Sequence, residues 1–398
     1  MCKIFYMKKY ILILSVLAIF AMSILQAQEP ESFDAAKSLA KIKNKPLLLE
    51  FERSDCEYCA EAARELEQNE SIKNMLGEVI YFPINVLIGE GVDLKERYAI
   101  GTTYPVFVLT NSAGEVISRW TGFNSPDNFI RHLQDALRDQ TTVGEKVAAF
   151  ESNPTLSGAL ELALYFTETQ EYLDALEYYR RAENLGGDRR MDYSFQIFKS
   201  MANAAWADMV PLDSVYPSAD WYLQSGLKSQ LNLVSLATIM SRLTRKYEDV
   251  SHLEKYLQAG IEACAGKKDP SSVEDYHLLV AELALQIDND TIAAINIREK
   301  GMGEDWERQP PKFYPYAQWC LERRINLVEA EGWARRAIEM ARTPEFKARV
   351  MNTVAEICLA RGNAQEAVHM IVLAIEQHPD NPFYDKQLEK FRQALEEK

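Results

Sequence analysis

Two cysteines separated by two residues are the side chains of this sequence best suited to covalent chemistry. Cys56 and Cys59 stand in the segment Arg53-Ser54-Asp55-Cys56-Glu57-Tyr58-Cys59. A pair at this spacing can exchange disulfides through a mixed-disulfide intermediate, with a thiolate as the attacking species. The same spacing also fits one half of a zinc site. The pair therefore indicates either redox or metal chemistry.

The sequence around the pair predicts elements that favour a thiolate. Residues 47–51 form a nearly continuous apolar run, which is typical of a strand buried on both faces. Residues 60–66 are rich in strong helix formers. Cys56 is thus expected at a helix N-terminus, where unpaired N–H groups and the helix dipole lower the pKa of a thiol.

The remaining cysteines and histidines argue against a metal site. No second CxxC exists, and all five histidines lie at position 132 or later. Six cysteines are too dispersed in a chain of 398 residues for a disulfide framework. Cys264, Cys320 and Cys358 fall within helical patterns and are expected to be buried free thiols. The sequence predicts neither a metal nor a cofactor.

The N-terminus reads as a secretory signal peptide over residues 1–27. Lys8 and Lys9 precede a run of about sixteen largely apolar residues, short for a membrane span, and Ala27 stands at a plausible cleavage site. The alternative is an uncleaved membrane anchor. We expect a secreted, periplasmic protein with no stable membrane span after cleavage. A net charge of −15 disfavours nucleic acid and anionic membranes as partners.

Strand and helix signals alternate over residues 28–142. The expected order is helix 33–41, strand 47–51, a helix from Cys59, helix 71–76, strand 79–86, helix 92–98, strand 106–110 and strand 115–120. Asn111-Ser112-Ala113-Gly114 has the composition of a hairpin turn between the last two strands. Ser125 and Pro126 predict the start of a final helix.

This α/β arrangement resembles the thioredoxin superfamily, in particular its secreted bacterial members. The likeness rests on the CxxC after the first core strand, on Thr103-Tyr104-Pro105 before a strand, and on the closing hairpin. It implies that Cys56 attacks a substrate disulfide and that Cys59 resolves the mixed disulfide. It further implies that Pro105 is cis, that Pro105 and Tyr104 contact the substrate, and that Glu50 is a buried acid that takes the proton of Cys59.

The CxxC departs from the family pattern in its charges. Asp55 occupies the position at which thioredoxins usually carry Trp, and Glu57-Tyr58 separates the cysteines. Like charges beside a thiolate raise the thiol pKa, so the reduced form is less favoured and the couple more reducing. We expect a reductant of protein disulfides. The alternative is a non-catalytic binding or scaffold protein with a vestigial thioredoxin fold.

Residues 143–398 predict an all-α domain of helical repeats. Amphipathic helical segments follow one another, and the small residues Ala355, Gly362, Ala367 and Ala374 are spaced as in a tetratricopeptide repeat, which this region resembles. We expect about five to seven helix pairs in an α-solenoid. Such a domain would bind a disulfide-bearing client or a redox partner protein, or would act only as a packing scaffold. The aromatic residues of this region, among them Trp206, Tyr216, Trp221 and Tyr222, are expected in the core or in packing between repeats rather than in a recognition patch.

Overall fold

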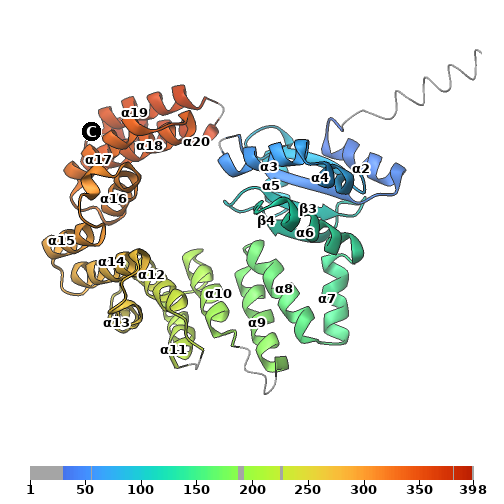
Figure 1. Ribbon diagram of the computed structural model, residues 1–398, viewed down its shortest axis with the longest axis horizontal. Helices are drawn as coiled ribbons and strands as arrows, with labels where there is room; N and C mark the ends of the chain where they lie inside the picture. The colour runs from blue at the N-terminus through green and yellow to red at the C-terminus, as the bar shows by residue number, and fades with distance from the viewer. Residues whose placement is uncertain (1–29, 55, 187–191, 225–226, 380, 397–398) are drawn as a thin grey trace, which may run out of the picture. The chain divides into compact units, whose positions relative to one another are not determined.

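The computed structural model describes residues 30–54, 56–186, 192–224, 227–379 and 381–396. The predicted signal peptide at 1–27 lies outside the described residues. The chain divides into two compact units, Met1–Glu145 and Lys146–Lys398, and each is considered by itself. Figure 1 colours the first unit blue to green and the second green to red.

The first unit contains a four-stranded sheet and five complete helices among its described residues. These elements are α2 (Phe33–Lys43), β1 (Leu47–Glu52), α3 (Glu57–Gln68), α4 (Glu70–Leu76), β2 (Ile80–Asn85), α5 (Glu90–Arg97), β3 (Val106–Thr110), β4 (Val116–Thr121) and α6 (Pro126–Arg138), with α7 (Val143–Ser152) crossing into the second unit. Helix α6 begins as the sequence predicts, with Ser125 as its N-cap and Pro126 in the first turn.

The sheet has the strand order β2-β1-β3-β4. Strands β1 and β2 are parallel, whereas β1–β3 and β3–β4 are antiparallel. The parallel pair needs a crossover, which α3 and α4 supply, and the β3–β4 pair needs only the turn at 111–114. Strand β1, the most continuous apolar run, therefore lies inside the sheet, and the CxxC follows its last residue closely.

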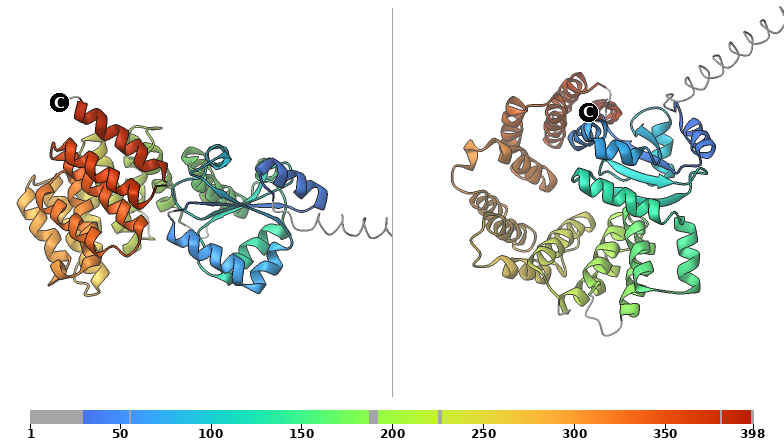
Figure 2. Two further views of the ribbon diagram at one scale, coloured as in Figure 1. Left: turned by 90° about the horizontal axis from the view of Figure 1, so that it is seen from above. Right: turned by 45° about the vertical axis from the view of Figure 1, so that its right-hand side comes forward.

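Helices cover both faces of the sheet, as Figure 2 shows. Side chains of α2 and α5 pack with Leu47, Leu49 and Phe51 on one face. Side chains of α3, α4 and α6 pack with Leu48 and Phe107 on the other. Because successive residues of a strand point to opposite faces, Glu50 belongs to the face of Leu48.

The second unit is helical throughout its described residues. Its elements are α8 (Leu156–Glu168), α9 (Tyr172–Gly186), α10 (Ser194–Trp206), η1 (Leu212–Ser214), α11 (Tyr216–Gln224), α12 (Gln230–Tyr247), α13 (Leu253–Cys264), α14 (Pro270–Gln286), α15 (Thr291–Gly301), η2 (Trp306–Arg308), α16 (Pro310–Arg323), α17 (Leu327–Met340), α18 (Pro344–Ala360), α19 (Ala364–Gln377) and α20 (Pro382–Glu396). Figure 1 shows them following one another in chain order.

Consecutive helices pack as pairs, from α8 with α9 to α18 with α19, and each pair packs on its neighbours. Six such pairs occur among the described residues, within the predicted five to seven. Small residues bring the helices close together: a Cβ at Gly260 of α13 would lie 2.9 Å from the Cβ of Ala237 on α12. The expected α/β domain followed by an all-α repeat domain of tetratricopeptide-like helix pairs is thus the fold of this chain.

The side chains singled out in the helical domain mostly lie where the sequence predicts. Cys264, Cys320 and Cys358 are buried free thiols, and Tyr216 and Tyr222 are buried. Trp206 and Trp221 lie outside the core, 47% and 37% exposed. The indole of Trp206 lies instead beneath the cationic groups of Arg242 and Lys246, at 4.9 and 5.4 Å.

Candidate redox site

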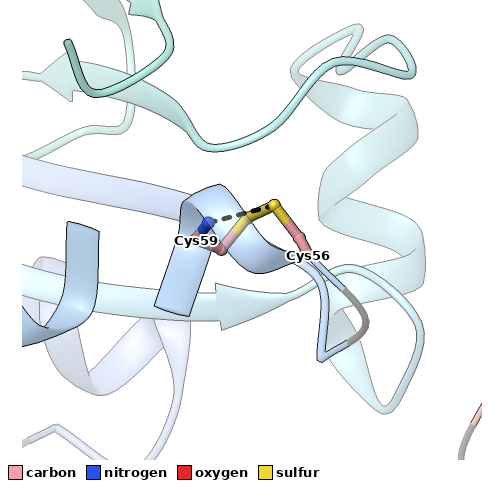
Figure 3. The surroundings of a disulfide bond; sticks show 2 residues. All are labelled: Cys56 and Cys59. Atoms are coloured by element: carbon pink, nitrogen blue, oxygen red, sulfur yellow. Dashed lines mark hydrogen bonds between the residues drawn. A yellow bond between two sulfur atoms is a disulfide. The ribbon is translucent and has the colours of Figure 1, made fainter. Parts of the chain in front are cut away.

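Cys56 and Cys59 form a disulfide at the start of α3 (Figure 3). Their Cα atoms are 5.1 Å apart. Cys56 is the N-cap of the helix, and its sulfur accepts a hydrogen bond of 3.1 Å from the backbone N–H of Cys59. Once the disulfide is reduced, the same N–H and the helix dipole favour a thiolate at Cys56.

The two sulfur-bearing residues differ in their access to solvent. Cys59 is 1% exposed and belongs to the core cluster of Leu49 and Phe51, whereas Cys56 is only partly buried. Tyr58, between them, is strongly exposed. An incoming disulfide can therefore reach Cys56 without any rearrangement of the core, and it cannot reach Cys59 in this way.

Tyr104 and Pro105 lie at the start of β3, joined by a cis peptide bond as predicted. Tyr104 is buried and shares its core cluster with Cys59. The carbonyl of Pro105 accepts a hydrogen bond of 2.8 Å from the N–H of Gly122. In the described part of the chain, neither the N–H nor the C=O of Tyr104 bonds to another backbone group. Among the described residues, the N–H and C=O of Tyr104 thus take no part in backbone pairing.

Glu50 is a buried carboxyl on β1, 1% exposed. Its Oε2 accepts a hydrogen bond from the hydroxyl of Tyr81, and its Oε1 has no hydrogen-bond partner among the described residues. Burial raises the pKa of Glu50 from 4.5 to about 7, with the hydroxyl of Tyr81 lowering it and the charge of Glu52 raising it. At neutral pH this carboxyl is poised to give or accept a proton.

Two residues near these groups were not identified from the sequence. Tyr81 lies on β2 opposite Leu48, diagonal to Glu50, so only the strand register brings its hydroxyl to the carboxyl. The guanidinium of Arg53 lies 5.7 Å from the ring centre of Tyr104. Of the two acidic residues expected to oppose a thiolate, Asp55 lies outside the described residues, and of Glu57 only the backbone is described.

The first unit is similar to a known protein family. A family model described as a thioredoxin-like domain matches residues 33–137. This segment is a thioredoxin-like domain. The strand order, the position of the CxxC at the start of α3 and the cis bond before β3 lie within it.

A curated relative carries a similar segment. The thiol:disulfide interchange protein DsbD of Salmonella typhimurium is 28% identical to this chain over 102 residues, which are 25% of this chain. The match spans only 18% of that relative's length. The similarity is thus limited to one segment of this chain and to a small part of that relative.

A solved structure resembles part of the chain more loosely. It is that of YrrB, described as a TPR protein with an unusual peptide-binding site. It covers 60% of this chain and 95% of its own, at 16% identity and a TM-score of 0.26. A similarity of this size says nothing about what the helical domain of this chain binds.

The described residues lack two other kinds of feature. Within the ranges that the structure describes, no helix is both long and apolar enough to cross a membrane. Over the same ranges, no three His, Cys, Asp or Glu side chains gather as metal ligands would.

Proposed function

We propose that this protein is a thiol–disulfide oxidoreductase that reduces disulfides of other proteins. The observation that carries the proposal is the asymmetry of the CxxC, with a partly exposed Cys56 at the N-cap of α3 and a buried Cys59. The Cys56 thiolate attacks one client sulfur, forming a mixed disulfide and releasing the other client sulfur as a thiolate. The Cys59 thiolate then attacks the sulfur of Cys56, which restores the Cys56–Cys59 disulfide and releases the reduced client.

Three further residues support this exchange in the proposal. Tyr104, whose N–H and C=O bond to no other backbone group among the described residues, pairs with the extended backbone of the client, and Pro105 lies beside it. As the family resemblance implies, Glu50 takes the proton of Cys59, which must be lost before the resolving step, although Cys59 belongs to the core cluster of Leu49 and Phe51 on the other face of β1. A pKa of about 7 suits Glu50 for that transfer near neutral pH.

The direction of electron flow and the client-binding role of the helical domain are parts of the same proposal. Asp55 and Glu57 add negative charge next to Cys56 in the sequence, which favours the disulfide form and hence a reductant. The helical domain binds the client or the protein that returns electrons, which raises the local concentration of that partner at the dithiol. The protein acts in the periplasm after removal of residues 1–27.

A disulfide-reduction assay with insulin as the substrate tests the proposal. The full chain should catalyse reduction by a small dithiol, and Cys56→Ser and Cys59→Ser should each abolish turnover. The potential of the pair, measured against glutathione, should lie below that of protein disulfide isomerase, about −180 mV. A higher potential refutes the role as a reductant. Absence of turnover in the unmutated chain favours the scaffold alternative.

A further inference from the structure

Arg53 lies in the turn between β1 and the CxxC, and its backbone is fixed relative to Cys56. The carbonyl of Arg53 accepts a hydrogen bond of 3.2 Å from the N–H of Cys56. The side chain of Arg53 is half-buried, and its guanidinium carbon lies 5.7 Å from the ring centre of Tyr104. A cation is attracted to an aromatic face at distances up to about 6 Å. Arg53 therefore links the turn that carries Cys56 to the segment that carries the cis peptide bond.

The backbone of Tyr104 is not held by strand pairing. Residues 102–104 form bends outside any helix or strand, and the pairing of β3 begins at Val106. In the part of the chain that the structure describes, the N–H and C=O of Tyr104 bond to no other backbone group. The position of Tyr104 therefore depends largely on its ring, which packs in the core cluster of Cys59 and against the guanidinium of Arg53.

The ring of Tyr104 and the backbone groups that would pair with a client belong to the same residue. A ring that moves takes its Cα with it and so changes the direction of the N–H and the C=O. Groups that must be ordered at the moment of binding weaken the binding, whereas groups already held in place do not. The contact with Arg53 provides such ordering from a residue that is itself bonded to Cys56.

We propose that Arg53 is a positioning residue for client proteins. Its guanidinium holds the ring of Tyr104, and thereby sets the N–H and C=O of Tyr104 for the extended backbone of a client whose disulfide lies at Cys56. Because this role concerns the client-binding site, it depends on the proposed function. It separates two kinds of substrate: a protein has a backbone that can pair with Tyr104, whereas a small disulfide needs only Cys56.

Reduction kinetics with two substrates test this role. Insulin is the protein client, and hydroxyethyl disulfide is an uncharged small disulfide without a peptide backbone. Arg53→Gln should lower kcat/KM for insulin about fivefold, through a higher KM at unchanged kcat, because the lost contact acts on binding. The rate at which hydroxyethyl disulfide oxidises the pre-reduced chain, followed by acid quenching and mass spectrometry, should stay the same.

Three further variants locate the effect in the contact with Tyr104. Arg53→Lys keeps a cation at this position and should recover most of the loss. In a Tyr104→Leu chain, Arg53→Gln should have no further effect on insulin reduction, because the contact is already lost. The matched control is Arg138→Gln, which removes an exposed arginine of α6 and should leave the kinetics with both substrates unchanged. If Arg53→Gln does not fold, Arg53→Met, which keeps the aliphatic part of the side chain, takes its place.

Three results would overturn the role of Arg53. The first is an Arg53→Gln chain that reduces insulin as the parent does. The second is an equal loss with hydroxyethyl disulfide, because Arg53 would then act on the Cys56 thiolate and not on client binding. The third is an undiminished effect of Arg53→Gln in the Tyr104→Leu chain. A parent chain that does not reduce insulin refutes the proposed function as well, whereas these three results refute only the role of Arg53.

Discussion

Glu50→Gln is expected to change how the stability of the thioredoxin-like domain depends on pH. The carboxyl is 1% exposed, and its pKa is raised from 4.5 to about 7, mainly by burial. Between these two values the folded chain binds more protons at Glu50 than the unfolded chain does. Stability therefore falls as pH rises through this window and is lowest above it. Glutamine does not titrate, so the variant escapes this loss.

The size of the effect follows from the shift. Moving the pKa from 4.5 to about 7 corresponds to about 3 kcal/mol of stability lost between pH 4 and pH 8. The difference in unfolding free energy between variant and parent should thus move in favour of Glu50→Gln by about 3 kcal/mol over that range. Its absolute value at low pH also includes the packing of the new amide, so the change with pH is the quantity to measure.

Hydrogen exchange of the β1 and β3 amides gives the opening free energy of this domain separately from that of the helical domain. The Glu50→Gln variant and the parent chain are compared at the same pH, so the intrinsic exchange rate of each amide cancels. Both are measured with the Cys56–Cys59 disulfide formed. Glu61→Gln, at an exposed position of α3, is the control for removing a carboxylate from the surface of the same domain. A stability difference that does not change with pH for Glu50→Gln would refute the buried carboxyl with a raised pKa.

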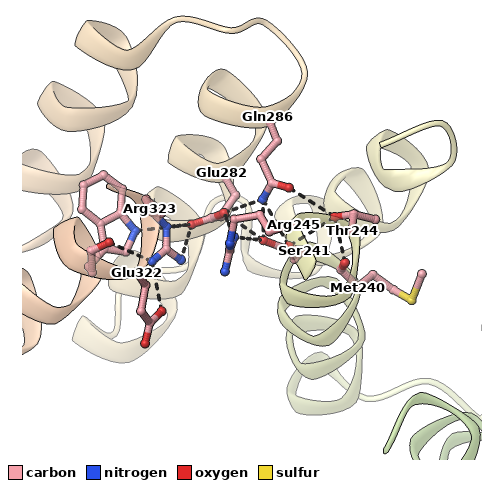
Figure 4. A network of polar contacts seen from close by, with 9 residues as sticks. Met240, Ser241, Thr244, Arg245, Glu282, Gln286, Glu322 and Arg323 are labelled. Carbon is pink, nitrogen blue, oxygen red and sulfur yellow. Dashed lines mark hydrogen bonds and ion pairs between the residues drawn. The ribbon is translucent and has the colours of Figure 1, made fainter. Parts of the chain in front are cut away.

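Three other outcomes follow from the same geometry. Tyr81→Phe removes the hydroxyl that lowers the pKa of Glu50, so a carboxyl ¹³C titration should show a higher midpoint. Glu282→Gln should destabilise the helical domain by about 3–5 kcal/mol in thermal or denaturant unfolding, because it leaves buried guanidinium groups uncompensated (Figure 4). In the reduced native chain, iodoacetamide should modify Cys56 at least about tenfold faster than Cys59, as peptide mass spectrometry would show.

Each of these has a matched control or a contrary result. A lower midpoint in Tyr81→Phe would mean that the hydroxyl does not stabilise the ionised carboxyl. Glu161→Gln, which removes an exposed partner of Lys146, should cost no more than about 1 kcal/mol, and an equal cost for Glu282→Gln would contradict the buried network. Cys320, with its pKa raised by burial to about 12, should stay unmodified in the alkylation experiment.

Local signals were enough to predict most of the thioredoxin-like fold. The strand at Val106–Thr110 and the helix capped by Ser125 appear at the predicted residues because their signals are contained within a few neighbouring positions. The CxxC at the start of α3 was predictable for the same reason, since an apolar strand and a run of helix formers flank it. Some strand ends differ from the prediction by one residue. Strand β1 was expected at 47–51 and spans Leu47–Glu52, because pairing with β2 extends it past its apolar part.

The long-range contacts could not be predicted in this way. Tyr81 meets Glu50 only through the register of β1 and β2, which neither segment encodes alone. Glu282 contacts Arg245 and Arg323, which lie about forty residues before and after it in the sequence. The repeat pattern of this region is degenerate, so it does not indicate which helices are neighbours. Trp206 was expected in the core or in repeat packing from its type, and only the packing of α10 near α12 brings it to Arg242.

The central claim is that Cys56 exchanges disulfides with other proteins and that Cys59 resolves the adduct. The most direct measurement is mass spectrometry of the adducts formed when Cys59→Ser and Cys56→Ser chains meet a protein disulfide such as that of insulin. Cys59→Ser should accumulate a stable mixed disulfide at position 56, and Cys56→Ser should accumulate none, because Cys59 is 1% exposed. Equal adducts in both variants, or none in either, would contradict the account.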